Sequence, residues 1–375
     1  MAGLKVLFVT ENSSDDDCSA VRRLLVLKEG LENLGVQTGI LYLGDYFLNT
    51  PRLILPVNIP HFLKIVGEYE IVHAAGVSSY VMGLAKPFGS FRLVCDVHGS
   101  AEESKLIKKG LFDLAGNYQW LVSLVSTKIS RKQGDFFITV SEPLRQKMIE
   151  EGIDKRRTEV IYNGVNTELF RPCKEKVANE TFTVTYAGAF QKWQGIENLV
   201  MAAQSLRNAE IKFKIIGFKK TDLLLKDEIR SKLGDRVELI DFLPNQPPEL
   251  IDHLSRSDVL IIPRYWDPNS ESYGNAKYLR DTFGWFPTKF AEYIATGRPI
   301  IVTNLDVSSD FVRRNDCGFV CDPTPASIAS AILEAKKMPS EELDKKGLRG
   351  RQLAEREFDF RVTGKKYLQS LSRMM

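Results

Sequence analysis

Short apolar runs alternate with longer segments of helical period along the whole chain. The apolar runs of the first half are KVLFVT, QTGILYL, EIVHAA, RLVCDV, DFFITV and EVIY, and those of the second half are FTVTYAG, IKFKIIG, RVELIDF, DVLIIP and PIIVTN. Helix-like segments lie between them, such as residues 18–35, which close on Gly35 as helices often do. Nearly continuous apolar strands separated by helices are typical of parallel sheets covered on both faces. The pattern therefore predicts an α/β fold.

The alternation pauses at residues 171–181, which are polar, contain a proline and lack periodicity. A chain of 375 residues is also long for a single core. We therefore expect two doubly wound, Rossmann-like parallel-sheet domains. The first comprises residues 1–170 and is completed by a C-terminal helix at 358–375, and the second comprises residues 178–357. Such folds bind ligands at the carboxyl ends of their strands, and two facing domains would form a cleft.

Composition narrows the class of protein. Hydrophobic content of 43% and charged content of 26% are those of a soluble globular protein, and a net charge of +3 is too small to indicate a nucleic-acid partner. The chain enters a strand-like run at once, so we expect no signal peptide, and no apolar run suits a membrane span. The cysteines lack metal-ligand spacing, which favours a reduced cytoplasmic setting without a metal site. They are Cys18, Cys95, Cys173, Cys317 and Cys321.

Residues 286–304, FPTKFAEYIATGRPIIVTN, predict a short helix that starts near Pro287, stops at Gly297 and leads into a buried strand. Lys289 and Glu292 lie opposite its apolar stripe, near the helix N-terminus. One interpretation is a solvated surface pair worth a few tenths of a kcal/mol. The other is a ligand site, because a helix N-terminus attracts phosphate and a carboxylate can accept hydrogen bonds from sugar hydroxyls.

Three further segments follow strands. His98 ends RLVCDVH, where it can either reach a ligand or be a loop histidine bonded to backbone. Asn163 and Gly164 form a turn dipeptide. In YAGAFQKWQGIENLV, Gly188 and Gly195 bracket a loop before a helix, an arrangement that lets backbone approach an anion.

The order and spacing of these segments resemble the family 4 glycosyltransferases of GT-B fold over essentially the full chain. The similar segments are VIYNGVNTELFRP, YAGAFQKWQGIENLVMAA, DFLPNQPPELIDHLSRSDVLIIP, FPTKFAEYIATGRPIIVTN and FITVSEPLRQKMIEEG. The resemblance implies that Glu292 holds the nucleotide ribose and that His98 lies beside the transferred sugar. It also implies that Gly188 and Gly195 flank a diphosphate-binding loop.

The chain departs from the family at several of these positions. Ala189 and Gln194 stand where the family usually has Arg and Lys, so two expected diphosphate cations are missing. Lys192, Arg264 or Lys289 could replace them. The Gly-Gly loop expected after the first strand is instead the acidic ENSSDDDCSA, and Gly284 stands where a second glutamate is expected.

Residues 264–285 form an unusually long connection for an α/β unit. The segment is rich in aromatic residues and returns to the Glu292 helix, so we expect a flap that shapes the donor or acceptor site. The alternative is that its aromatic side chains only pack the segment. The flap candidates are Trp266, Glu271 and Tyr273.

The resemblance implies a retaining hexosyltransferase that moves a sugar from a nucleotide-diphosphate sugar to a hydroxyl of a glycan, a lipid-linked molecule or a small molecule. Such an enzyme is expected to need no metal or other cofactor, and to act in the synthesis of cell-envelope glycans in the cytoplasm. The basic residues Lys105, Lys108 and Lys109 would bring it to the inner face of the membrane, unless they are only a solvated helix end. The alternatives are a non-catalytic partner subunit and, ranked lower, a sugar-nucleotide epimerase, for which only Glu102 and Glu103 supply nearby carboxylates. The donor-site candidates are Gly188, Lys192, Gln194, Gly195, Arg264, Lys289 and Glu292.

Overall fold

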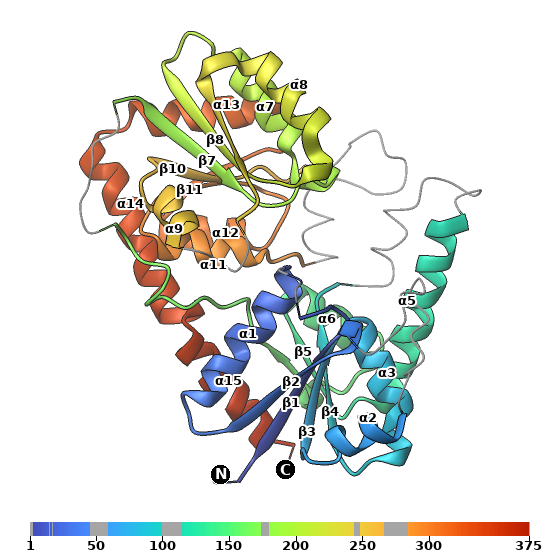
Figure 1. Cartoon of the computed structure of the whole chain (residues 1–375). Coiled ribbons are helices and arrows are strands. Elements are labelled where there is room, and N and C mark those ends of the chain that lie inside the picture. Colours follow the sequence, from blue (N-terminus) through green and yellow to red (C-terminus); the bar gives the residue numbers. More distant parts are fainter. Residues whose placement is uncertain are drawn as a thin grey trace. The chain divides into compact units, whose positions relative to one another are not determined.

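The computed structural model describes residues 3–14, 16, 18–45, 59–99, 114–173, 180–243, 248–265 and 284–374. The chain forms two compact units (Figure 1). Unit 1 comprises Met1–Asn163, Asp281–Trp285 and Phe360–Met375, and unit 2 comprises Gly164–Arg280 and Phe286–Asp359. The chain leaves unit 1 ahead of the polar segment at 171–181. The reason is that Val165 donates its backbone N–H to the Phe358 carbonyl, which places the residues after Asn163 in unit 2.

Unit 1 is built on a six-stranded sheet of order β2-β1-β3-β4-β5-β6, in which every pairing is parallel. Its strands are β1 (Lys5–Thr10), β2 (Gln37–Tyr42), β3 (Ile71–Ala75), β4 (Arg92–Val97), β5 (Phe136–Thr139) and β6 (Thr158–Val160). Its α-helices are α1 (Ser19–Glu32), α2 (Ile59–Val66), α3 (Val77–Ala85), α5 (Leu114–Gln133), α6 (Glu142–Glu150) and α15 (Phe360–Ser372). Its 3₁₀ turns are Leu43–Asp45, Lys86–Phe88 and Lys155–Arg157.

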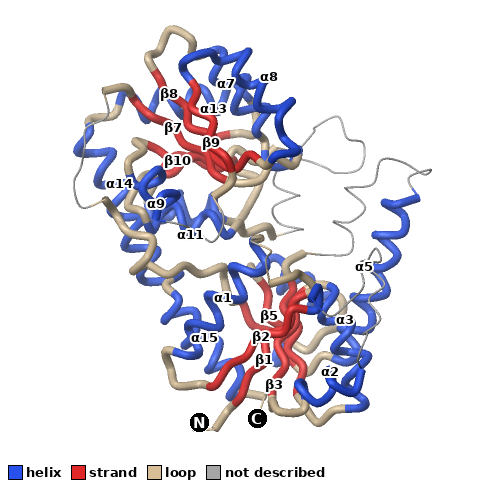
Figure 2. Tube along the Cα trace, in the orientation of Figure 1, coloured by secondary structure: helices blue, strands red, loops and turns tan. Residues whose placement is uncertain are grey.

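Helices cover both faces of the unit 1 sheet (Figure 2). On one face, Leu24 and Leu27 of α1 pack with Tyr367 of α15 against strand residues. On the other face, Val81 and Met82 of α3 pack against the sheet. The last helix of the chain therefore completes the core of the first unit, although α15 is far from β1 in sequence.

Unit 2 has a second six-stranded sheet of order β12-β11-β10-β7-β8-β9, again parallel throughout. Its strands are β7 (Phe182–Ala187), β8 (Ile211–Phe218), β9 (Val237–Asp241), β10 (Val259–Ile262), β11 (Ile300–Thr303) and β12 (Gly318–Cys321). Its α-helices are α7 (Ile196–Ser205), α8 (Leu223–Leu233), α9 (Pro248–Ser255), α11 (Thr288–Ala295), α12 (Ser308–Asn315), α13 (Pro325–Lys337) and α14 (Ser340–Leu353). Shorter turns are Lys192–Gln194, Lys220–Asp222, Gly234–Arg236 and the π-helical Ala354–Phe358.

Both sheets confirm the predicted α/β fold with doubly wound parallel sheets. Because all strands of a sheet point the same way, the residues that follow them gather at one edge. Within the described residues, no helix is both long enough and apolar enough to cross a bilayer.

Candidate functional site

Helix α11 is fixed directly to the end of strand β7. The Tyr293 hydroxyl oxygen accepts a hydrogen bond from the Ala187 backbone N–H at 2.6 Å and donates one to the Ala187 carbonyl at 2.8 Å. Pro287 is the N-cap residue, with extended backbone, and so lies one position before the first turn in which we expected it. The bonds of Tyr293 bring the N-terminus of α11 to the loop that follows β7.

Lys289 extends from α11 into that loop. Its Nζ lies 3.1 Å from Oε1 of Gln194 and 3.3 Å from the hydroxyl oxygen of Tyr186. The ammonium also stands over the Tyr186 ring, 4.5 Å from the ring centroid. Gly188 has a φ of 152°, and a Cβ at this position would collide with the Lys289 ammonium. The charge of Lys289 therefore lies beside the glycine that the sequence places in a diphosphate loop.

Gly195 closes the same loop at the N-terminus of α7. Its φ of 76° and ψ of 23° are left-handed, and a Cβ would collide with the Pro263 carbonyl oxygen. The Tyr265 backbone N–H donates to the Trp193 carbonyl at 3.1 Å. Glycine is therefore required here by the close approach of the chain leaving β10, whether or not a ligand is bound.

Arg264 follows β10 and approaches a buried carboxylate from the next strand connection. Its Nε lies 3.4 Å from Oδ2 of Asp306, and its carbonyl accepts a hydrogen bond from the Thr303 hydroxyl at 2.9 Å. Burial raises the pKa of Asp306, against the opposing effects of Arg264, Ser308 and Lys289. Two cations from different connections, Arg264 and Lys289, thus act on one carboxylate at this edge of the sheet.

Glu292 is only 5% exposed, and its neighbours from Phe290 to Ala295 are buried as well. This burial contradicts the solvated surface pair that the sequence also allows, because unit 2 packs around most of α11. Phe290 contacts Phe286 and Phe358, which accounts for one side of this enclosure.

The remaining donor-site candidates lie nearer the surface or beyond the described residues. Lys192 and Ala189 are exposed, and Gln194 is half-buried. Trp266, Glu271 and Tyr273 of the predicted flap lie outside the described residues, as do the basic residues Lys105 and Lys108. Lys109, Glu102 and Glu103 also lie outside them. The structure therefore brings together Gly188, Gln194, Gly195, Arg264 and Lys289 at one edge of the unit 2 sheet.

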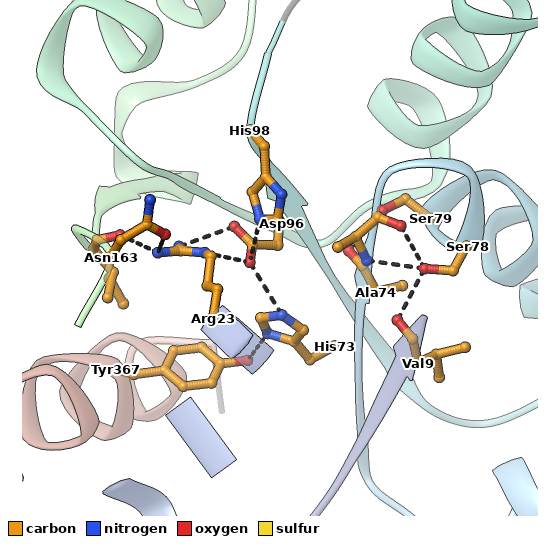
Figure 3. Close-up of polar contacts among 12 residues, drawn as sticks. Val9, Arg23, His73, Ala74, Ser78, Ser79, Asp96, His98, Asn163 and Tyr367 are labelled. Atoms are coloured by element: carbon orange, nitrogen blue, oxygen red, sulfur yellow. Dashed lines mark hydrogen bonds and ion pairs between the residues drawn. The ribbon is translucent and has the colours of Figure 1, made fainter. Parts of the chain in front are cut away.

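In unit 1, His98 follows β4 and contacts a buried carboxylate (Figure 3). Its Nε2 lies 2.9 Å from Oδ2 of Asp96, and its side chain is 30% exposed while that of Asp96 is 1% exposed. Arg23 donates two hydrogen bonds to Asp96, from Nε to Oδ2 at 2.8 Å and from Nη2 to Oδ1 at 3.0 Å. Burial alone would raise the pKa of Asp96. The charge of Arg23, followed by the interactions with His98 and His73, outweighs burial and holds that pKa well below its usual value.

The acidic loop after β1 places Glu11 at the N-terminus of α3. The backbone N–H groups of Val77 and Ser78, at the start of α3, act on the pKa of the Glu11 carboxylate. A Cβ on Gly76 would lie 2.8 Å from Oε1 of Glu11. Burial raises the pKa of Glu11, while these N–H groups and His98 act to lower it. The chain's own carboxylate thus occupies the helix end that an anion would otherwise favour.

Sequence reasoning misses most of the supporting residues. Arg23 is 2% exposed and lies on the buried face of α1. A charged residue at such a position indicates a buried partner of opposite charge. Asp96 and His73 interrupt otherwise apolar strands, which is a weaker signal. The sequence marks Asn163 only as a turn residue, but its side-chain oxygen accepts a hydrogen bond from Arg23 Nη1 at 3.2 Å.

Two family models match the chain in succession. One is described as Glycosyltransferase Family 4 and matches residues 2–169, and the other is described as Glycosyl transferases group 1 and matches residues 171–352. Within the described residues, no group of three or more His, Cys, Asp or Glu side chains has the arrangement of a metal site.

Curated relatives are about a quarter identical to the chain within the aligned regions. A D-inositol 3-phosphate glycosyltransferase of Mycolicibacterium smegmatis is 24% identical over 288 residues, covering 72% of this chain and 63% of that protein. Its counterpart in Rhodococcus jostii is 26% identical over 46% of this chain and 37% of that protein. A Klebsiella pneumoniae protein described as uncharacterized, in the cps region, is 27% identical over a region that covers 39% of this chain and 40% of that protein. The matches therefore span less than two thirds of each relative.

Solved structures share the fold over the whole chain. Sucrose-phosphate synthase of Thermosynechococcus elongatus has a TM-score of 0.74 at 17% identity, covering 99% of both chains. Anabaena HepE in complex with UDP-glucose has a TM-score of 0.72 at 16% identity, covering 98% of this chain and 99% of that one. The two family models follow one another along nearly all of the sequence, and they show that the chain belongs to the family 4 (group 1) glycosyltransferases, with the GT-B fold that the solved structures share.

Proposed function

We propose that this chain is a retaining glycosyltransferase that moves a hexose from a nucleotide-diphosphate sugar to an acceptor hydroxyl. Unit 2 binds the donor, with the diphosphate at the loop from Gly188 to Gly195 and the ribose at Glu292. His98 of unit 1 binds the transferred sugar. Because Anabaena HepE, which shares the fold, forms a complex with UDP-glucose, UDP sugars are the first donors to test.

One observation carries the proposal, namely the position of Lys289. The family expects a cation where Gln194 stands, and the Lys289 ammonium lies 3.1 Å from the end of the Gln194 side chain. A preorganised ammonium can stabilise the charge that builds on the leaving diphosphate. Lys289 thus supplies from α11 one of the two charges that Ala189 and Gln194 lack.

No step of this mechanism requires a metal ion, because protein cations carry the charge compensation. No covalent nucleophile is needed either, since a retaining enzyme of this fold is expected to deliver the acceptor from the leaving-group face. Chelation should therefore leave turnover unchanged. Loss of turnover in EDTA that returns with added magnesium would contradict this part of the proposal.

We infer further that the acceptor is a glycan or lipid-linked hydroxyl of the cell envelope, used on the cytoplasmic side of the membrane. A relative whose name places it in a cps region supports this choice. Helix α5 also presents Leu121 and Val125 to solvent, 52% and 40% exposed. Co-sedimentation with vesicles that contain anionic lipid would support membrane docking, and absence of the protein from the pellets of both anionic and neutral vesicles would exclude it.

The function itself is tested by a thermal-shift panel of nucleotide sugars followed by product analysis. A donor at a hundred times its Kd should add about 2.7 kcal/mol to the free energy of unfolding. Incubation of that donor with acceptor, or with water alone, should release the nucleoside diphosphate and give a product whose anomeric configuration by NMR is that of the donor. Inversion would refute the retaining assignment. Nucleotide binding without any turnover would favour a non-catalytic subunit.

A further inference from the structure

A buried polar chain connects the C-terminal helix to His98. The Tyr367 hydroxyl of α15 lies 2.7 Å from Nδ1 of His73, and Nε2 of His73 lies 3.3 Å from Oδ2 of Asp96 (Figure 3). The same carboxylate oxygen meets His98 Nε2 at 2.9 Å. Tyr367 and His73 are both fully buried. Neither residue reaches solvent, so neither contacts a substrate directly.

The chemistry of the donors fixes where the protons lie. A nitrogen lone pair facing an ionised carboxylate would be repelled by it, so we assign a proton to each histidine nitrogen that lies beside Asp96. Burial lowers the pKa of His73, which keeps this ring neutral, and its other nitrogen must then accept a hydrogen bond. Tyr367 meets this need, because burial raises the pKa of its hydroxyl well above the usual value and keeps it protonated.

Arg23 holds Asp96 from the opposite side. Besides its two bonds to the carboxylate, its Nη1 donates to the Ile161 carbonyl at 2.8 Å. Asp96 is therefore held between an arginine from α1 and a histidine from β3. The third contact to the carboxylate comes from His98, whose side chain is 30% exposed.

We propose that Tyr367 and His73 act through Asp96 as positioning residues that hold His98 with its proton on Nε2, which leaves Nδ1 to accept a hydrogen bond from a hydroxyl of the transferred sugar. The proposal rests on the proposed function, in which His98 binds that sugar. It extends the site to α15, the last helix of the chain, and gives the buried histidine a role in the reaction.

The test is the tautomer of His98, read by ¹⁵N NMR of the imidazole nitrogens in protein labelled at histidine. The chain has four histidines, so the signals can be assigned with single His→Gln variants. The wild-type protein should show His98 protonated at Nε2. In Asp96→Asn the side-chain amide donates to the ring, so His98 should move its proton to Nδ1, as in a triad whose carboxylate is made an amide. His98 found protonated at Nδ1 in the wild-type protein would overturn the proposal.

Tyr367→Phe provides a second test, in which the buried carboxylate of Asp96 is kept. Without the Tyr367 hydroxyl, Nδ1 of His73 loses its donor and Asp96 is held less firmly, so the variant should show shifted His98 signals with the proton still on Nε2, kcat lowered by about tenfold and KM for the donor nearly unchanged. Tyr80→Phe, on α3 of the same unit, is the matched control and should match the wild-type protein in both respects. Wild-type His98 signals and wild-type kcat in Tyr367→Phe would show that the tyrosine only supports the fold and would overturn its positioning role.

The tautomer measurement needs no substrate, so it separates this proposal from the proposed function. If the protein transfers no sugar but the His98 proton moves in Asp96→Asn, the function is wrong and the positioning chain stands. If the protein transfers sugar and Asp96→Asn leaves both the tautomer and kcat unchanged, the positioning chain is wrong and the function stands.

Discussion

The Nζ of Lys289 lies 3.1 Å from Oε1 of Gln194, although the two residues are 95 positions apart in the sequence. This contact brings a cation from α11 to the loop where the family usually carries its own. The missing charges of that loop therefore do not by themselves indicate an inactive protein.

Lys289→Met should weaken binding of a nucleoside diphosphate by about 10- to 100-fold, because a hydrogen bond to a charged group contributes about 1.5–3 kcal/mol. Binding of the nucleoside without phosphates should hardly change. Lys337→Met is the matched control, since this exposed lysine ends α13, and a crossover helix ends at the amino edge of a parallel sheet. Calorimetry with UDP and with uridine measures the affinity of each variant for the nucleoside diphosphate and for the nucleoside. An equal loss for the two ligands would contradict a phosphate role for Lys289.

Glu292→Gln should weaken both the nucleoside and its diphosphate, because the ribose is common to them. Glutamine is the appropriate replacement, since Glu292 is 5% exposed and alanine would leave a cavity in unit 2. Far-UV circular dichroism and the unfolding midpoint should stay close to the wild-type values. Unchanged uridine and UDP affinities in a folded variant would refute the ribose assignment.

His98→Ala should lower kcat by about a hundredfold while leaving the Kd of the bare nucleotide within about twofold, because the lost contact is to the sugar. The measurement is turnover alongside UDP calorimetry. A parallel collapse of UDP binding would place His98 on the nucleotide instead.

Glu11→Gln should change how stability depends on pH. Burial raises the pKa of Glu11 above its ordinary value, so the folded protein holds this proton more tightly than the unfolded chain does. The resulting contribution favours the folded state at low pH and is lost as pH rises through the folded pKa. Relative to the wild-type protein, Glu11→Gln should therefore become more stable as pH rises above about 4.3, the ordinary pKa of a glutamate. Glu341→Gln, at an exposed position on α14, is the control. Denaturant unfolding at each pH measures the difference, and a wild-type slope in Glu11→Gln would contradict the burial argument.

The fold follows from the sequence because alternation of apolar runs and helical segments is a local property. The same local signals locate α11 and the loop from Gly188 to Gly195. Long-range partners give no such signal. Tyr367 reaches His73 from 294 residues away, and nothing around either residue indicates the other. Similarly, Glu292 is only 5% exposed, although the pattern of an eight-residue helix places it opposite the apolar stripe, because burial depends on what the rest of unit 2 packs against the helix.

The sequence raises the question of which residue replaces the missing loop cations, but it cannot answer it. Three residues, Lys192, Arg264 and Lys289, are equal candidates by sequence. Their different surroundings emerge only from tertiary contacts, since Lys192 is exposed, Arg264 approaches Asp306 and Lys289 enters the loop. The contacts that each cation makes, and not its residue type, separate them.

The most direct test of the account is a calorimetric rescue with UDP, using Lys289→Met and the double variant Gln194→Lys/Lys289→Met. Returning a lysine to the loop position, within hydrogen-bonding reach of the original ammonium, should restore most of the UDP affinity that Lys289→Met loses. The result that would contradict the account is a double variant that binds UDP no better than Lys289→Met, because Lys289 would then not be supplying the missing charge of the loop.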